Sequence, residues 1–151
     1  MKIADKFTVA AERDTVWKFV TDPDKFIKLI PDLQRYEKVD ERNFKTVFKV
    51  GLGMIKGTIN MAFKYEELNP PSNLKIVGRG SGMQSTADLT LQLQLNPVDG
   101  GTEVSWSADI LVGGLVASVG SRLMESTTKS KVREIVEGLK RELEGGRKKK
   151  K

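Results

Sequence analysis

The stretch Leu115 to Leu143, LVASVGSRLMESTTKSKVREIVEGLKREL, decides the fold. Its apolar residues recur three and four positions apart, the spacing that places side chains on one face of an α-helix. This periodicity predicts one long amphipathic helix, ended by Gly145 and Gly146. The eighty or so residues before it are almost all strand-like. A single long helix after such a run predicts a curved antiparallel sheet with the helix across its mouth, an arrangement that encloses a cavity.

Working outward, the apolar positions alternate with polar ones, which is typical of half-buried strands. Tight turns between the alternating segments predict antiparallel neighbours. Asp22 before Pro23 is an N-cap signal for a short helix. The expected order is a strand at Ile3 to Val9, short helices opening at Ala11 and over Asp24 to Leu29, strands at Tyr36 to Val39, Phe44 to Val50, Thr58 to Glu67, Leu74 to Gly80, Ala87 to Leu95 and Thr102 to Ile110, and the long helix.

The composition bounds the chemistry. The chain of 151 residues suits one domain, expected over residues 1–144, followed by a flexible basic tail over residues 145–151. Cysteine and histidine are both absent, which excludes disulfides, thiolate nucleophiles, the usual zinc sites and Ser-His-Asp catalysis. We therefore expect no metal and no cofactor. With no apolar run of about 18 residues and no signal peptide, a cytoplasmic location is expected, and the absence of cysteine hints at a thermophile.

The element order and several motifs resemble the helix-grip fold of the START and birch-pollen-allergen superfamily (SRPBCC), and within it CoxG, a subunit of carbon monoxide dehydrogenase. The resemblance implies an α+β fold of about seven strands wrapped on the terminal helix. It also implies an apolar cavity for a lipid or isoprenoid quinone, and a non-catalytic role beside a molybdenum carbon monoxide dehydrogenase at the membrane. The residues that carry it are Trp17, Leu29 to Leu33, Val50 to Gly57, Gly78 to Gly82, Val112 to Leu115 and Gly120 to Leu123.

Two glycine-rich segments leave alternatives open. Gly51 to Gly57 lacks the spacing of a phosphate-binding loop, so it is either a hairpin connection that needs positive φ or a gate at the cavity mouth, with Met54 and Ile55 as its lip. Gly78 and Gly80 share the inward face of their strand. They either allow a bend in the sheet or leave space for a ligand, and the two readings are compatible.

The middle of the long helix, Glu125 to Lys131, has no apolar residue. Small hydroxyls at Thr127 and Ser130 either face a cavity, where they donate hydrogen bonds to a ligand, or lie in a solvated section beyond the sheet. We expect a closed apolar cavity of several hundred Å³, the usual range for ligand pockets. Its predicted lining is Phe26, Phe48, Met54, Ile59, Met61, Phe63, Met83, Leu91, Trp106, Leu123, Thr127 and Ser130.

The charge sits at the C-terminus. The chain has 26 Lys and Arg against 20 Asp and Glu, and its last five residues are all basic, so the body is nearly neutral. Each basic residue near an anionic bilayer contributes about 1 kcal/mol, so this segment predicts weak peripheral contact with a membrane, and no nucleic-acid binding is expected. The residues concerned are Arg147, Lys148, Lys149, Lys150 and Lys151.

Two other functions compete with the carrier. An enzyme of the cyclase or hydrolase type needs an acid or base inside the cavity, and a ligand-free interaction module needs a cavity filled by side chains. Asp88 and Asp109 fall on outward faces by alternation, so the acid-base candidates are poor. The candidates without histidine are Tyr36, Tyr65, Glu66, Glu67, Asp88 and Asp109.

Overall fold

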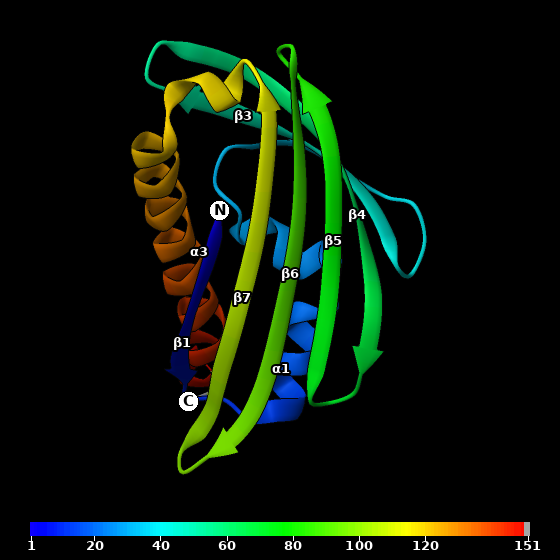
Figure 1. Ribbon diagram of the computed structural model, residues 1–151. Coiled ribbons are helices and arrows are strands. Elements are labelled where there is room, and N and C mark those ends of the chain that lie inside the picture. The colour runs from blue at the N-terminus through cyan, green and yellow to red at the C-terminus, as the bar shows by residue number, and fades with distance from the viewer. Residues whose placement is uncertain (150–151) are drawn as a thin grey trace.

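The computed structural model describes residues 1–149, and side chains through residue 145. It confirms the predicted α+β architecture, a curved antiparallel sheet with a long C-terminal helix and two short helices after the first strand (Figure 1). The elements are β1 (Lys2–Val9), α1 (Arg13–Val20), α2 (Pro23–Phe26), the 3-10 turn η1 (Ile27–Leu29), β2 (Leu33–Lys38), β3 (Asn43–Leu52), β4 (Ile55–Asn69), β5 (Asn73–Gly82), β6 (Ser85–Val98), β7 (Gly101–Gly114), the 3-10 turn η2 (Val116–Val119) and α3 (Ser121–Lys149).

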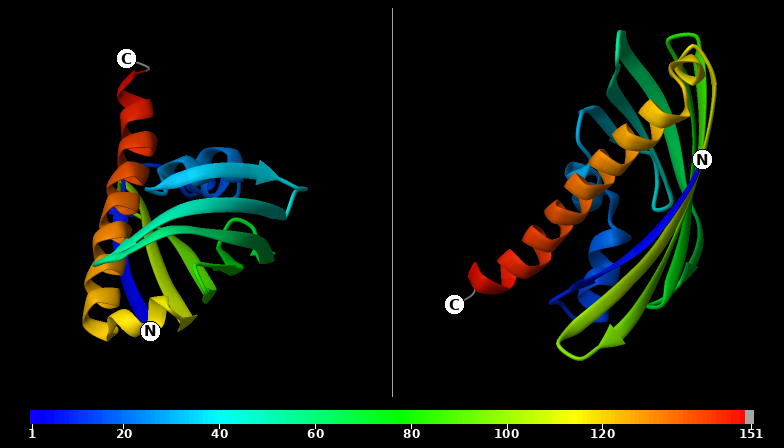
Figure 2. Two further views of the ribbon diagram at one scale, coloured as in Figure 1. Left: turned by 90° about the horizontal axis from the view of Figure 1, so that it is seen from above. Right: turned by 60° about the vertical axis from the view of Figure 1, so that its left-hand side comes forward.

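The sheet has seven strands in the order β1-β7-β6-β5-β4-β3-β2, and every neighbouring pair is antiparallel. Only β1 leaves sequence order, because it crosses to pair with β7. The sheet curves strongly, and α3 runs diagonally across its concave side, with the short helices on that side too (Figure 2). No helix within residues 1–149 has the length and hydropathy to cross a membrane.

Both ends of the long helix differ from the prediction. Gly120 has a φ of 94°, which breaks the helical path, so α3 begins at Ser121 and the segment before it forms the separate turn η2. At the other end, α3 continues through Gly145 and Gly146 to Lys149. A glycine inside a helix costs only about 1 kcal/mol relative to alanine, so it does not end a helix that otherwise continues. The predicted tail therefore begins as helix, and Lys150 and Lys151 lie outside the described residues.

Packing is dense where α1 and the C-terminal half of α3 cover the sheet. Tyr65 is 1% exposed, and its hydroxyl donates a 2.8 Å hydrogen bond to the carbonyl oxygen of Val20 at the end of α1. The Phe44 ring stacks on Phe63 with centroids 5.1 Å apart. The other fully packed side chains of this core are Val9, Val16, Ile27, Leu74, Ile76, Leu95, Val104, Leu139 and Leu143.

Candidate ligand cleft

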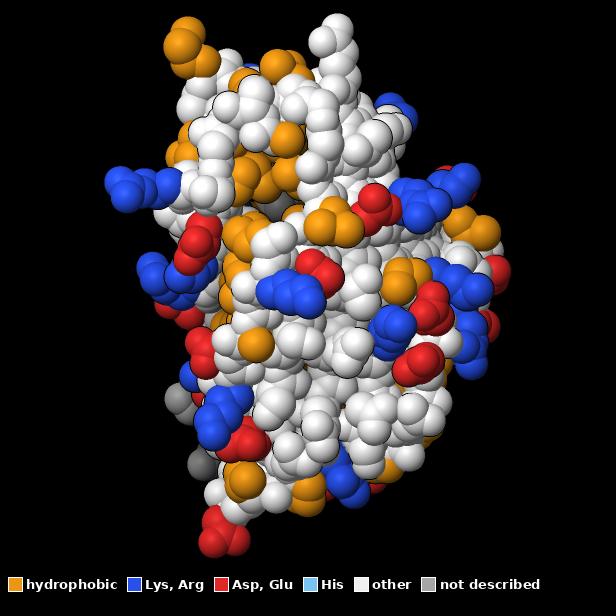
Figure 3. Space-filling model, viewed as in Figure 1, with side chains coloured by type: hydrophobic (Ala, Val, Ile, Leu, Met, Phe, Trp, Pro, Cys, Tyr) orange, Lys and Arg blue, Asp and Glu red, His pale blue; other side chains and the backbone are white. Residues whose placement is uncertain are grey.

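On β6 and β7 most inner-face residues are less buried than Leu95 and Val104. On β6, Leu95 is 1% exposed, whereas Leu89 and Leu91 on the same inner face are only half-buried. On β7, Val104 is fully buried, and Ile110, six residues further along, is half-buried. The sheet therefore has a packed half, near α1, and an open half, near the start of α3. Figure 3 shows hydrophobic side chains gathered around a hollow beside the upper part of β7.

The position of α3 explains the open half. Helix α3 makes backbone approaches to β1 at one edge of the sheet and to β3 towards the other. Between these two approaches α3 spans the concave side (Figure 2). A close-packed interior leaves few voids larger than a water molecule, so apolar side chains that remain partly exposed beneath a helix mark a space without protein atoms. We call this space, between α3 and the inner faces of β4, β6 and β7, the cleft.

The structure places part of the predicted lining on the inner face of the sheet. Phe48, Ile59, Leu91 and Trp106 lie on inner strand faces and are half-buried, as is Leu123 on α3. The alternation pattern also marked Leu89 and Ile110 as inward, and the two are paired across β6 and β7 next to Leu91, but the predicted lining did not include them.

Other predicted residues belong to the packed core or lie at the rim. Met61 and Phe63 are each 8% exposed and belong to the core. Phe26 is half-buried in α2, and Met83 is half-buried at the β5–β6 turn. Met54 is 98% exposed at the β3–β4 turn, so it lines no interior surface.

The glycine segments have structural explanations. Pairing between β3 and β4 continues through Gly51 and Gly57, and Gly53 turns the hairpin with a φ of 62°, so the prediction of a hairpin connection is confirmed. Gly78 and Gly80 do not leave empty space. A Cβ atom at Gly78 would lie 2.6 Å from the Phe63 ring, and one at Gly80 would lie 2.1 Å from the backbone oxygen of Asn60.

The polar stretch of α3 lies over the open half. Thr127 is half-buried, and its hydroxyl makes no hydrogen bond with another described residue. The hydroxyl of Thr128 donates to the Met124 carbonyl oxygen at 2.8 Å, so it is already occupied. Ser130 is exposed, which agrees with a solvated position. Thr127 is therefore the hydroxyl in this stretch that remains available to a polar group of a bound molecule.

Polar contacts hold α3 across the mouth. Lys131 Nζ lies 2.6 Å from a carboxylate oxygen of Asp32, in the loop between η1 and β2. This contact raises the pKa of Lys131, chiefly through the hydrogen bond to Asp32. Nearer the C-terminus, Glu144 accepts a 2.8 Å hydrogen bond from the backbone N–H of Ala10. No sequence signal pairs these groups, because they are distant in the chain and meet only after the sheet curves.

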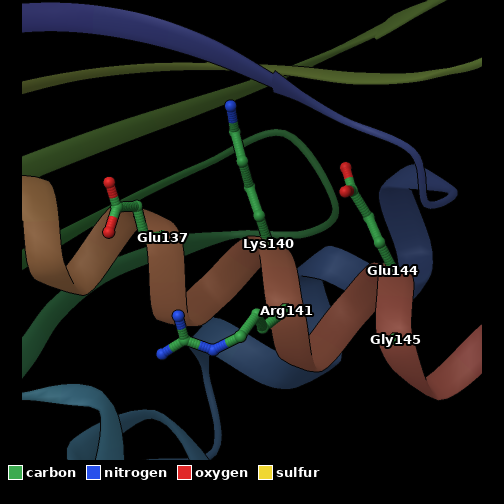
Figure 4. Close-up of a pocket in the computed structure, with 5 residues that line it drawn as sticks. All are labelled: Glu137, Lys140, Arg141, Glu144 and Gly145. Carbon is green, nitrogen blue, oxygen red and sulfur yellow. The ribbon is translucent and has the colours of Figure 1, made fainter.

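Two surface pockets lie elsewhere. One, of about 370 Å³, is formed by Glu137, Lys140, Arg141, Glu144 and Gly145 on α3 (Figure 4). Another, of about 360 Å³, lies on the outer face of the sheet and includes Lys75 and Gln92. Both are open to solvent and carry charged or polar groups, so neither is the closed apolar cavity that the sequence predicts. The apolar space in this conformation is the open cleft.

The acid-base candidates named from the sequence are not gathered in the cleft. No Asp or Glu among the described residues is buried. Asp88 accepts a 2.9 Å contact from Arg79 Nε on the outer face, and Glu66 pairs with Lys75 at 3.2 Å. The tyrosine hydroxyls are also engaged, because Tyr65 donates to Val20 and Tyr36 donates to Asp24 at 2.7 Å. None of these groups is arranged as an acid-base pair in the apolar cleft.

Burial raises the pKa of Tyr65 above its ordinary value of 10.0, and burial together with the Asp24 hydrogen bond raises that of Tyr36. A raised pKa favours the neutral form in the folded state. Stability from Tyr65 is therefore fully present below pH 10 and is lost as the pH rises further. In the variant Tyr36→Phe, Tyr65 is the only tyrosine. We expect the phenolate absorbance of this variant at 295 nm to appear only when the protein unfolds at alkaline pH. Titration of that variant at the ordinary value while still folded would contradict the burial argument.

The comparisons with known proteins agree with this geometry. The family model of CoxG, a carbon monoxide dehydrogenase subunit, matches residues 6–144. No curated protein sequence matches the chain significantly. Among solved structures, the chain is similar to a conserved protein from Geobacillus kaustophilus, with a TM-score of 0.88, 20% identity and 96% of each chain covered.

Two further structures share the fold. TTHA0849 from Thermus thermophilus has a TM-score of 0.71 and 11% identity, over 97% of this chain and 99% of that one. Ara h 8.0201 has a TM-score of 0.69 and 16% identity, over 96% and 98%. At these identities the likeness shows the fold alone, and it confirms the helix-grip fold that the resemblance implied.

Proposed function

We propose that this chain, which belongs to the CoxG family of carbon monoxide dehydrogenase subunits, binds an apolar molecule in the cleft between α3 and the sheet. The ligand class is a lipid or an isoprenoid quinone. In this proposal the protein is a non-catalytic carrier or membrane-recruitment factor for a molybdenum carbon monoxide dehydrogenase-type oxidoreductase. The observation that carries the ligand class is the partly exposed apolar inner surface around Leu89, Leu91 and Ile110.

The lining of the cleft supports an apolar ligand. Ligand pockets are mostly apolar, with a few polar groups that fix orientation. Here the floor is made of leucine and isoleucine, and Thr127 offers a free hydroxyl from the opposite side. Each partly exposed leucine that a ligand covers contributes up to about 1 kcal/mol, because most of its surface is already buried. A long unbranched or isoprenoid chain fits such a surface, because its binding depends on covered area and little on hydrogen bonds.

The positions of the ionisable groups favour a carrier over an enzyme. General acid-base catalysis needs a titratable group within hydrogen-bond reach of the substrate. Asp88 and Glu66 are engaged in ion pairs on the outer face, and Tyr65 is engaged with Val20 in the packed half. The partly exposed apolar inner surface also argues against an interaction module, because such a module would have its interior filled by side chains. The carrier role is therefore supported by the positions of the ionisable groups and by the apolar lining of the cleft.

Leu91→Asp is expected to abolish most apolar binding. The substitution places a carboxylate on the cleft floor. The affinity for a quinone is expected to fall about tenfold or more, since covering an unpaired carboxylate costs several kcal/mol and tenfold is only about 1.4 kcal/mol. Gln92→Asp is the matched control, because Gln92 is the next residue on β6 and faces outward in an exposed position. Quenching of Trp106 by a quinone, measured in a Trp17→Phe background, reports the binding.

Mass spectrometry of lipids that co-purify with the native chain tests the proposal directly. We expect an isoprenoid or acyl-chain molecule in the native protein and in Gln92→Asp, and a reduced amount in Leu91→Asp. Recovery of no such molecule, together with no quenching by quinones and no binding of fatty acids, would rule out the carrier role.

A further inference from the structure

Three connections meet at one end of the sheet, which we call the tip: residues 50–57, 82–87 and 112–124. A Cβ at Gly53, in the β3–β4 turn, would lie 3.5 Å from the Leu123 side chain at the start of α3. The backbone N–H of Leu115 donates to the Gln84 carbonyl oxygen in the β5–β6 turn at 3.0 Å. The N–H of Val116 donates to Ser85 Oγ at 2.8 Å. The three segments therefore form one continuous surface at the top of Figure 1.

The tip exposes large apolar side chains. Met54 is 98% exposed and Leu115 is 43% exposed. A single exposed apolar residue needs no explanation, but these two lie on adjacent segments that project beyond the strands. Elsewhere, Val98 is 41% exposed, at the opposite end of β6. The chain therefore offers both a candidate contact surface and a matched position away from it.

The charge of the tip has one sign. Its three segments contain Lys56 and Arg122 and no Asp or Glu. Both basic residues are exposed, and neither makes an ion pair with another described residue. The N-terminus of α3, at Ser121, directs the positive end of the helix dipole to the same end. On the face shown in Figure 3, the upper end carries hydrophobic, uncharged and basic atoms, and the acidic side chains lie further down.

We propose that the tip docks on an anionic lipid bilayer, with Met54 and Leu115 inserted between headgroups and with Lys56 and Arg122 beside the phosphates. Apolar side chains on narrow projecting turns suit insertion into a fluid interface, and the purely basic charge complements anionic lipid. The tip is a different part of the sequence from the basic C-terminal residues. The hollow of Figure 3 opens near the tip, so docking would bring the cleft to the bilayer. The docking deepens the membrane-recruitment part of the proposed function, and its consequence for the cleft rests on the carrier part.

The absence of cysteine makes the test direct, because Met54→Cys and Val98→Cys each create one labelling site. An environment-sensitive fluorophore is attached to the full chain at each site. Vesicles of phosphatidylcholine with phosphatidylglycerol are added, and vesicles of phosphatidylcholine alone serve as the comparison. We expect a blue shift and stronger emission from position 54 with the anionic vesicles, and no change from position 98. An equal response at the two positions would overturn the proposal.

Vesicle sedimentation gives the second measurement. We expect Met54→Glu to lower the partition coefficient about tenfold, and Val98→Glu to leave it unchanged. Replacing Arg147 to Lys151 with serine tests the tip without the basic C-terminal residues. A fluorophore shift at position 54 that remains in this variant supports docking through the tip. If Met54→Glu partitions onto vesicles as strongly as the wild type, the proposal is overturned. It is also overturned if the wild type sediments without vesicles and Met54→Glu does not, because the partner of the tip would then be a second copy of the chain. Quinone binding is measured without vesicles, so failure of docking and failure of the carrier role are distinguishable.

Discussion

Phe44→Ala is expected to lower the free energy of unfolding by about 3–5 kcal/mol, the usual cost of removing a buried phenylalanine ring. The Phe44 side chain is 1% exposed and stacks on Phe63, and its centroid lies 6.0 Å from Tyr65 and 6.1 Å from Tyr36. Removing it leaves a cavity among rings that belong to β2 and β4. These rings cannot collapse together without shifting strands, so relaxation will recover little of the loss. Urea unfolding followed by circular dichroism measures the effect.

Phe48→Ala is the control for this prediction. Phe48 lies on the same face of β3, four residues further along, but it is half-buried and borders the open half of the molecule. Its truncation is expected to cost clearly less than that of Phe44, because part of the ring already contacts solvent. Equal losses in the two variants would show that the interior is packed alike along β3, and this would remove the physical basis of the cleft.

Gly80→Ala is expected to destabilise the fold by about 3 kcal/mol, at the upper end of the cost of overpacking. A Cβ atom there would lie 2.1 Å from the backbone oxygen of Asn60 and 2.3 Å from the sulfur of Met61. A side chain moves at small cost, but the backbone oxygen belongs to β4, so the strands must separate locally. The loss therefore comes from strand pairing as well as from contact with Met61.

Gly51→Ala is the matched control for Gly80→Ala. Gly51 also lies in a strand, and nothing lies within 4 Å of a Cβ built on it. The substitution is expected to leave stability within about 0.5 kcal/mol of the native value, as for other surface changes. Thermal unfolding of the two variants side by side measures the difference. A Gly80→Ala protein as stable as Gly51→Ala would show that β4 and β5 do not approach as closely as described.

Local patterns predicted most of the fold. Alternation over Ala87 to Leu95 and over Thr102 to Ile110 identified two strands and their inward faces, because side-chain direction in a strand has a period of two. Helix boundaries were less accurate. Leu115 to Val119 continues the apolar spacing of the helix but forms η2, since the φ of Gly120 separates it from α3. The spacing carries no information on that backbone angle.

The candidate site was predicted in part. Leu91, Trp106 and Thr127 were assigned to the lining and are half-buried, whereas Met61 and Phe63 are core residues. The strand residues of these two groups lie on the same face but on different strands: Met61 and Phe63 on β4, and Leu91 and Trp106 on β6 and β7. Alternation distinguishes the inner face from the outer one. It does not show where α1 and the C-terminal half of α3 cover that face.

The sequence by itself determined the order of elements, the inner apolar faces and the absence of imidazole and thiol chemistry, because these follow from residue type and near-neighbour spacing. Tertiary structure alone decided where the interior is packed and where it is open. That outcome depends on how sharply the sheet curves and on contacts such as Lys131 with Asp32, which join segments about a hundred residues apart. It also decided that Met54 and Leu115 meet at one end, since three turns converge there only when the strands are paired in register.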